Sequence, residues 1–360
     1  MTPTQFETLD GVKLPYPLFF PDATRAVVKA LDNTDIESTQ TPGILVNTLH
    51  LHMSPGADVI KKQGGVRKFM DWHGAIISDS GGFQVMSIAK NVGGKVNDQG
   101  VTFQLPNQPK SKLTPELSIK IQLALKTDLM VVLDDFTPPG ASLEEARATV
   151  ERTILWAKQC REAFDTYAPK TGKKPYLIGV VQGGDHLELR AECTKRLVEI
   201  GFDGLGYGGW PMNDRGDFNY DVPRVIREHS PENYILYGLG VGKPQEVVRL
   251  VKEGWSVFDC VLPTRDARHK RLYVYNAKTI DGIDLDEEKF YSYYTPDKEK
   301  YYRDDSPVST ACDCILCTRY SKSYLAHLFR IGDMTAGRLA TIHNLRFYSI
   351  MMEKLRGLFE

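Results

Sequence analysis

The chain has 360 residues, of which 42% are hydrophobic and 25% are charged, and its formal net charge is −1. These values are typical of a globular protein with a sizeable core, and no run approaches the roughly 20 apolar residues of a membrane span. The near-neutral charge excludes a protein that attracts nucleic acid through a global positive field, so any anionic partner must be held by local patches.

Eight short apolar runs recur along the chain, with stretches of helical periodicity between several of them. Amphipathic helices are predicted at 142–164, which a capping box of Ser142 and Glu145 would begin, and at 187–201, which Gly201 would end. Alternating strands and helices favour parallel βα units, and eight strands close a (β/α)8 TIM barrel, with a doubly wound open sheet as the alternative. The expected strands are 16–20, 44–47, 75–79, 129–134, 176–182, 203–208, 234–239 and 256–261.

Carboxylates, an amide and glycines follow these strands at one end of the expected barrel. Catalytic groups of such barrels lie at the carboxyl ends of the strands, because the loops there converge on one face. We therefore expect one pocket in which Asp79 and Asp259 face the same cavity, as two carboxylates that can share nucleophilic and acid/base roles at a glycosidic bond. The strand ends carry Asp79-Ser80-Gly81-Gly82, Asp134-Asp135, Gln182-Gly183-Gly184, Gly208-Gly209, 238–242 and Asp259.

Simpler roles compete at two of these ends. Asp259 could instead cap a helix or pair with Arg265, and Asp134 with Asp135 could bind a divalent metal ion. The glycine pairs could be ordinary strand-to-helix turns, or they could let the backbone approach a ligand closely.

The C-terminal part has a different character. Residues 280–305 are acidic, rich in tyrosine and weakly patterned, which predicts exposed connections with little core. Cys312, Cys314 and Cys317 then follow at a spacing that suits one structural, tetrahedral Zn2+ ion, with His327 or His343 as the fourth ligand. We expect a barrel domain at 1–275, an inserted zinc-binding subdomain at 276–345 and a C-terminal helix at 346–360 that packs back on the barrel.

Cysteine usage and the N-terminal sequence bear on location. Six cysteines, of which three are clustered, are typical of a reduced protein with a metal site rather than of a disulfide framework. The first residues show no basic region followed by an apolar core, so we expect a cytoplasmic protein with no membrane partner.

Residues 262–272 are strongly basic and follow Asp259 closely. Such a run is often only a solvated surface, but beside a catalytic-type acid it favours phosphate binding and hence a polyanionic substrate. The run contains Arg265, Arg268, His269, Lys270 and Arg271, and the zinc region could extend it with Arg319, Lys322, Arg330, Arg338 and Arg346.

From about residue 16 to its C-terminus, the chain resembles the tRNA-guanine transglycosylases, particularly their bacterial branch. The segments that carry the resemblance are SDSGGFQVM, LDDFTPP, GVVQGG, GFDG…GG, GVGKP, FDCVLPTR and CDCILC…H. The resemblance implies a (β/α)8 barrel with a zinc-binding subdomain, which exchanges guanine at the anticodon wobble position of tRNA for a 7-deazaguanine in queuosine biosynthesis. It also implies a homodimer.

The resemblance also implies roles for individual residues. Asp259 would be the nucleophile that forms a covalent enzyme–tRNA intermediate, and Asp79 the general acid/base. In the base pocket, Asp134 would accept from the purine N–H edge, Gln182 and the Gly209 N–H would face its carbonyl oxygen, and Phe83 and Leu239 would sandwich the ring. The pocket would also include Asp79, Ser80, Gly81 and Gly82. The segments that contact tRNA would be Gly240, Val241, Gly242, Lys243, Pro244, Gln245 and Glu246, with Thr264, Arg265, Asp266, Ala267 and Arg268, and the zinc ligands Cys312, Cys314, Cys317 and His343.

Two positions depart from the family pattern near the expected site of the 7-substituent. Phe136 stands where bacterial members usually carry cysteine, and residues 210–214 begin with Trp210 and Pro211 instead of the usual small and apolar residues. The pattern favours 7-aminomethyl-7-deazaguanine as the incoming base, with queuine as the second choice. The sequence is also compatible with a paralogue that takes a different incoming base or a DNA substrate, and with a non-catalytic tRNA-binding subunit, although Asp79, Asp134 and Asp259 are all present.

Overall fold

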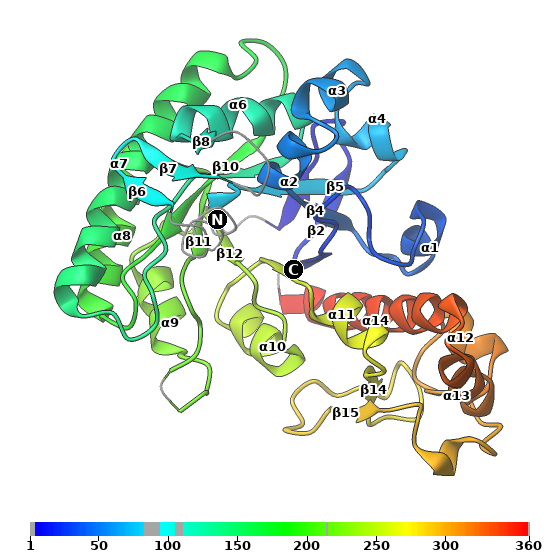
Figure 1. Ribbon diagram of the computed structural model, residues 1–360. Coiled ribbons are helices and arrows are strands. Elements are labelled where there is room, and N and C mark those ends of the chain that lie inside the picture. Colours follow the sequence, from blue (N-terminus) through cyan, green and yellow to red (C-terminus); the bar gives the residue numbers. More distant parts are fainter. Residues whose placement is uncertain (1–3, 83–93, 105–110, 214, 359–360) are drawn as a thin grey trace.

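Eight parallel strands form the centre of the molecule (Figure 1). The computed structural model describes residues 4–82, 94–104, 111–213 and 215–358. The strands lie in the order β3-β13-β12-β11-β10-β9-β5-β4, and an Asp22–Leu45 bridge links the first to the last, so that the sheet is nearly closed into a barrel. The strands are β3 (Leu18–Pro21), β4 (Gly43–Asn47), β5 (Ala75–Asp79), β9 (Leu129–Val131), β10 (Tyr176–Val181), β11 (Gly204–Tyr207), β12 (Ile235–Gly238) and β13 (Val257–Cys260).

The predicted (β/α)8 barrel is thus confirmed, and each expected strand overlaps an observed one. The strands are nearly continuous apolar runs because helices cover the outer face of the barrel while side chains fill its interior. The two predicted helices are confirmed as α7 (Leu143–Tyr167), with the Ser142–Glu145 capping box, and α8 (Leu187–Ile200), which ends at Gly201.

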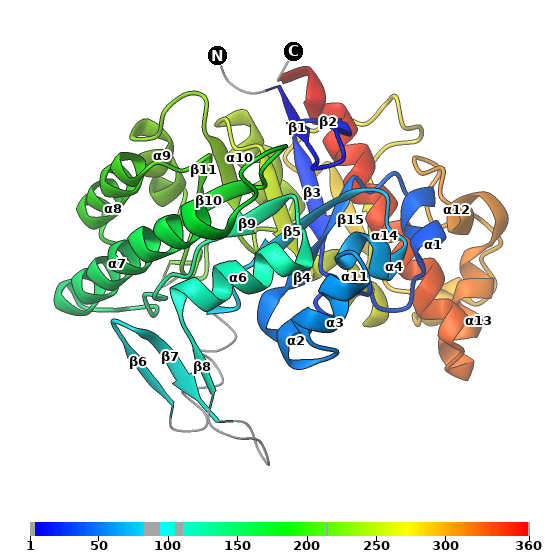
Figure 2. The same cartoon turned by 90° about the horizontal axis from the view of Figure 1, so that it is seen from above.

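The remaining helices of the barrel are short. They connect the strands or cover them from outside (Figures 1 and 2). They are α1 (Asn33–Ser38), α2 (Thr48–Met53), α3 (Ala57–Lys62), α4 (Val66–Met70), α6 (Pro115–Leu125), α9 (Asp221–Glu228), α10 (Pro244–Lys252) and α11 (Leu262–Arg268).

Two small antiparallel sheets were not predicted. The hairpin of β1 (Gln5–Glu7) and β2 (Lys13–Pro15) precedes the barrel. A second sheet, formed by β6 (Lys95–Asn97), β7 (Gly100–Phe103) and β8 (Ser111–Leu113), projects from it below α6 in Figure 2. Strands of three or four residues are too short to show alternating polar and apolar residues, and these strands, unlike those of the barrel, are not apolar runs either.

The C-terminal part lies beside the barrel and is joined to it by one long helix. The expectation of exposed connections with little core at 280–305 was wrong in part: most of the segment is exposed, but β15 (Tyr291–Tyr294) pairs with β14 (Leu272–Tyr275). Its tyrosines pack on aromatic side chains, and Phe290 and Tyr294 are buried. The other elements are η1 (Glu299–Tyr301), α12 (Ile315–Arg319), α13 (Lys322–Ile331), α14 (Met334–Leu355) and η2 (Arg356–Leu358).

The helix α14 is buried along most of its length and packs against α11, β14 and β3. The domain boundary expected at residue 346 falls inside this helix, so one continuous element carries His343 and contacts the barrel. Among the residues that the structure describes, none of the helices has the length and apolar character needed to cross a bilayer.

Candidate active site

Asp79 and Asp259 lie at the same, carboxyl, end of the barrel, on β5 and β13. Asp79 Oδ2 accepts a hydrogen bond from Asn47 Nδ2 at 2.7 Å, and its Oδ1 accepts from the backbone N–H groups of Thr48 and Gly81 at 3.2 and 3.1 Å. Asp259 Oδ1 accepts from the Tyr237 hydroxyl at 2.7 Å and from the Gly240 N–H at 3.0 Å. Each carboxylate is thus held by neutral donors, and neither forms an ion pair with a residue that the structure describes.

Burial raises the pKa of both carboxyl groups, and the charge of Asp259 adds to the effect at Asp79. Burial, and then the charge of Asp259, raise the pKa of Asp79 to about 7. Burial also raises the pKa of Asp259 to about 6, against its hydrogen bonds from Gly240 and Tyr237. Near neutral pH Asp259 is therefore mostly ionised while Asp79 is partly protonated, which suits a nucleophile beside an acid/base.

The simpler roles considered for Asp259 do not match its surroundings. It lies within β13, and α11 is preceded by Val261, so Asp259 does not cap that helix. Its hydrogen bonds go to Tyr237 and Gly240, whereas Arg265 Nε lies 3.9 Å from Asp266.

Asp134 and Gln182 form a second polar group at this end of the barrel. Gln182 Nε2 donates to Asp134 Oδ2 at 2.6 Å, while Gln182 Oε1 accepts from the Thr137 N–H at 3.1 Å. These two bonds fix the orientation of the amide, so that its NH2 group lies on the side of Asp134. Burial raises the pKa of Asp134 to about 6.

Asp135 does not share the surroundings of Asp134. It is buried in an ion pair with Arg152, and its N–H donates to Thr153. Neither aspartate belongs to a metal-competent cluster among the described residues, so the alternative of a divalent metal site is not supported there.

The glycines make close contacts with protein atoms. A Cβ on Gly208 would lie 2.6 Å from Gln182 Nε2, and one on Gly82 would lie 2.6 Å from Leu133 Cδ1. Gly81 and Gly209 adopt φ values of +77° and +93°, which favour glycine. In this structure the glycines therefore allow the strand ends to pack tightly against each other.

Two further pocket residues are described, and one is not. The Ser80 hydroxyl accepts from the Gly82 N–H at 3.1 Å, and the Ser80 carbonyl accepts from Ser118, so Ser80 supports the turn. Leu239 is half-buried and follows β12. Phe83 lies outside the described residues.

The segment 240–246 is mostly engaged within the protein. Val241, Gly242, Pro244 and Glu246 are buried. Lys243 pairs with Glu246 at 3.0 Å, and Gln245 accepts from the Tyr291 hydroxyl at 2.6 Å.

In the segment 264–268 only the arginines reach outward. Thr264, Asp266 and Ala267 are buried, and Asp266 accepts from the Tyr273 hydroxyl at 2.7 Å. Arg265 is exposed and Arg268 is half-buried, so these two cations remain available to a phosphate.

Part of the expected basic surface is internal. Arg346 is buried and donates to Asp313 at 2.6 and 3.0 Å and to Glu353 at 2.6 Å. Arg338 pairs with Asp35 through two nitrogens. The expectation was therefore wrong for Arg346, which is buried, whereas Arg338 is partly exposed and has its charge balanced by Asp35. Arg319 and Arg330 are exposed, and Lys322 pairs with Asp304.

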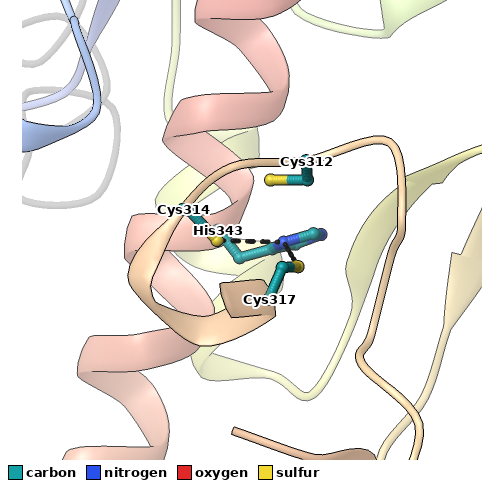
Figure 3. Close-up of side chains that lie close together, drawn as sticks. All are labelled: Cys312, Cys314, Cys317 and His343. Atoms are coloured by element: carbon teal, nitrogen blue, oxygen red, sulfur yellow. Dashed lines mark hydrogen bonds between the residues drawn. The ribbon is translucent and has the colours of Figure 1, made fainter. Parts of the chain in front are cut away.

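Cys312, Cys314, Cys317 and His343 come together as a buried cluster (Figure 3). Their ligand atoms all lie within 4.8 Å of one another, and His343 Nδ1 is 3.6 and 3.2 Å from the sulfurs of Cys314 and Cys317. Ligand atoms around a tetrahedral zinc ion lie roughly 3.5–3.8 Å apart, so the cluster has a suitable size for a metal ion.

Position and burial distinguish His343 from His327 as the fourth member of the cluster. His343 Nε2 lies 2.8 Å from the Tyr273 carbonyl oxygen, which requires a proton on Nε2 and leaves the Nδ1 lone pair free for a metal. His327 is exposed on α13 and is not in the cluster, so His343 is the fourth member.

Asn47 and Tyr237 contact the two key carboxylates and were missed from sequence. Asn47 was recognisable in principle, because it is the last residue of an expected strand at the catalytic end. Tyr237 lies inside an apolar run and has no such signal.

A (β/α)8 barrel that gathers three carboxyl groups with raised pKa values at the carboxyl ends of its strands has the organisation of an enzyme. The family model described as "Queuine tRNA-ribosyltransferase" matches residues 4–358. The queuine tRNA-ribosyltransferase of Haemophilus ducreyi is 38% identical over 345 residues, which cover 96% of this chain and 85% of the relative. Those of Acinetobacter baylyi and Shewanella putrefaciens are 37% and 39% identical over 96% of this chain, and 84% and 87% of their own lengths.

The chain therefore belongs to the queuine tRNA-ribosyltransferase family, and it is an enzyme of the transferase class. The family resemblance noted in the sequence is confirmed.

Proposed function

We propose that this enzyme exchanges guanine at the wobble position of tRNA for a 7-deazaguanine by a retaining double displacement through a covalent enzyme–tRNA intermediate. The observation that carries the proposal is the pair Asp79 and Asp259, two carboxyl groups at one end of the barrel that form no ion pair within the described part of the chain and whose pKa values are raised to about 7 and about 6. Family membership supplies the class of substrate.

Asp259 is the nucleophile. Tyr237 and Gly240 both donate to its Oδ1, and among the described residues nothing donates to its Oδ2. This second oxygen can attack C1′ of the ribose, and the C1′–N9 bond breaks as guanine leaves with the electron pair. A second displacement by the incoming base restores the configuration at C1′.

Asp79 is the general acid/base. With a pKa of about 7 it can donate its proton to the departing guanine and then accept one from the incoming base. Asn47 and two backbone N–H groups orient its carboxyl group throughout.

The purine is recognised by the group around Gln182. Asp134 accepts from the N–H edge of the base, while the NH2 of Gln182 and the N–H of Gly209 donate to its carbonyl oxygen. Leu239 and Phe83 sandwich the ring. To enter this pocket the wobble nucleotide must leave the anticodon stack, which costs less in a loop than in a duplex.

The incoming base is 7-aminomethyl-7-deazaguanine, with queuine as the second candidate. Trp210, with a relative exposure of 53%, directly follows Gly209, which gives a physical reason to test larger 7-substituents as well. The free base and the tRNA are the two substrates, and Arg265 with Arg268 holds the phosphates of the anticodon arm.

The Cys312–Cys314–Cys317–His343 cluster holds one Zn2+ ion. Three thiolates and one imidazole make a closed set of four ligands, so the ion stabilises the fold and takes no part in the reaction. We further propose the division into a barrel (1–275), a zinc-binding subdomain (276–345) and a C-terminal segment (346–360), and a cytoplasmic homodimer.

The direct test is incorporation of labelled guanine into unmodified tRNA that carries guanine at the wobble position. Wild type and Asp165→Asn, a control for an exposed acid that pairs with Arg161, should exchange guanine, whereas Asp259→Asn should not. The proposal would be overturned if folded, zinc-loaded wild type failed to exchange guanine, or if Asp259→Asn exchanged it at the wild-type rate.

A further inference from the structure

Arg190 is a buried cation whose surroundings differ from those of other buried charges in this protein. It lies in the first turn of α8, and its side chain is completely buried, with 0% exposure. Its hydrogen bonds within the described part of the chain go to backbone carbonyl oxygens, without a carboxylate partner: Nε donates to Gly184 at 2.8 Å, and Nη1 donates to Val181 at 2.5 Å and to Gly208 at 2.8 Å.

This arrangement is costly in two ways. A buried guanidinium without an anion lacks the ion pair that normally offsets its desolvation, and burial lowers its pKa accordingly. In addition, the first turn of a helix carries partial positive charge, which disfavours a cation. Arg346 shows the ordinary solution, since its buried guanidinium is paired with Asp313 and Glu353. A further role would explain why the fold retains Arg190.

The carbonyls that Arg190 binds belong to two loops of the candidate base pocket. Val181 is the last residue of β10, directly before Gln182, Gly184 follows Gln182 by two residues, and Gly208 follows β11. One guanidinium thus connects the loop that carries Gln182 with the loop that carries Gly209. Its Nη2 is buried without a hydrogen-bond partner among the described residues, 3.1 Å from the position of a Cβ on Gly209.

The contact with Gly208 is the most informative, because the Gly208 carbonyl and the Gly209 N–H are the two ends of one peptide group. A charged donor on the carbonyl oxygen polarises that peptide and makes its N–H a stronger donor on the opposite side. A preorganised N–H of this kind is worth most where negative charge develops during a reaction.

We propose that Arg190 is a positioning residue that orients and polarises the Gly208–Gly209 peptide, so that the Gly209 N–H binds the carbonyl oxygen of the purine as negative charge develops on the departing base. The inference rests on the proposed function, since it needs a purine in this pocket. Arg190 itself does not touch the base.

The test compares two competitors of labelled guanine in the exchange assay: unlabelled guanine, and 2-aminopurine, which lacks the carbonyl oxygen. Inhibition constants are measured for wild type, Arg190→Gln and Arg190→Lys, and for Arg346→Gln as a control for loss of a buried arginine elsewhere. In Arg190→Gln the inhibition constant of guanine should rise at least about tenfold, the lower end of the range for one charge-assisted hydrogen bond, while that of 2-aminopurine stays within about twofold. Arg190→Lys should recover part of the loss, because it keeps a cationic donor.

Each outcome decides between the roles. General damage to the protein, for which Arg346→Gln is the control, would raise the inhibition constants of guanine and 2-aminopurine equally. Such an equal rise in Arg190→Gln would overturn the inference. An Arg190→Gln variant in which neither constant changes would overturn it as well. If Arg190→Gln fails to fold, Arg190→Lys provides the same comparison of the two bases. The inference is also overturned if the wild-type enzyme does not bind guanine more tightly than 2-aminopurine. Guanine exchange by wild type is read separately, so the proposed function can stand while this inference fails.

Discussion

The contact between Tyr237 and Asp259 gives a quantitative prediction for Tyr237→Phe. The hydroxyl is fully buried, donates to Asp259 Oδ1 at 2.7 Å and lowers the pKa of that carboxyl, which burial raises to about 6. A hydrogen bond to a charged group contributes about 1.5–3 kcal/mol, which corresponds to about 1–2 pH units. Its loss should therefore raise the pKa of Asp259 by roughly this amount.

The effect should appear in the pH dependence of exchange. Asp259 must be ionised to attack the ribose, so activity is lost as the pH falls through its pKa. In Tyr237→Phe the acidic limb of kcat/KM should move to higher pH by about 1–2 units, with a deficit at neutral pH that shrinks as the pH rises. Guanine incorporation measured from pH 5 to 9 checks this.

A matched control comes from the neighbouring strand. Tyr207 on β11 is also buried, but its hydroxyl has no hydrogen-bond partner among the described residues. Tyr207→Phe should leave the acidic limb where it is in wild type. The reasoning is refuted if Tyr237→Phe keeps the wild-type limb, or if both variants shift it equally.

Three further predictions concern stability, metal and packing. Folding raises the pKa of Asp259 to about 6, so its carboxyl group lowers the free energy of unfolding by about 3 kcal/mol above pH 6, and this loss disappears as the pH falls. Asp259→Asn should therefore raise the Tm measured by calorimetry more at pH 8 than at pH 5. Chelation, or His343→Ala, should remove about one zinc per chain in metal analysis and lower the Tm, whereas His327→Ala should keep its metal. Gly208→Ala should reduce guanine exchange at least about tenfold, because the new Cβ would displace Gln182 Nε2. The control is Gly337→Ala, where α14 has open space around the new Cβ. This variant should keep its activity, and its free energy of unfolding in denaturant should rise by up to about 1 kcal/mol.

The barrel was predictable because its strands are apolar runs at regular intervals, and the carboxyl ends of such strands must meet on one face. Asp79, Asp134, Gln182 and Asp259 could therefore be assigned to one region from sequence. Their partners could not, since Tyr237 lies within an apolar strand and its hydroxyl direction depends on the packed barrel.

Charges presented the opposite difficulty. Arg338 and Arg346 look like surface cations in the sequence, but their partners Asp35 and Asp313 are 303 and 33 residues away along the chain. The burial of Tyr294 and the edge contact of Tyr291 with Phe347 of α14 likewise have no local signal, because strand pairing with β14 and packing on α14 are long-range contacts. Local pattern shows where charged and aromatic residues occur but does not show what neutralises or buries them.

The buried carboxyl groups of the barrel have two kinds of partner, and this difference separates the structural carboxyl groups from the proposed catalytic ones. At the end where β9 begins, the buried carboxylate of Asp128 is bonded to the Arg67 guanidinium at 2.7 Å and to two backbone N–H groups. At the opposite end Asp135 is likewise paired with Arg152, but within the described ranges Asp79 and Asp259 accept hydrogen bonds from neutral donors and from no cation. An ion pair would neutralise the two carboxyl groups to which the proposed reaction gives catalytic roles, so their neutral surroundings are consistent with that proposal.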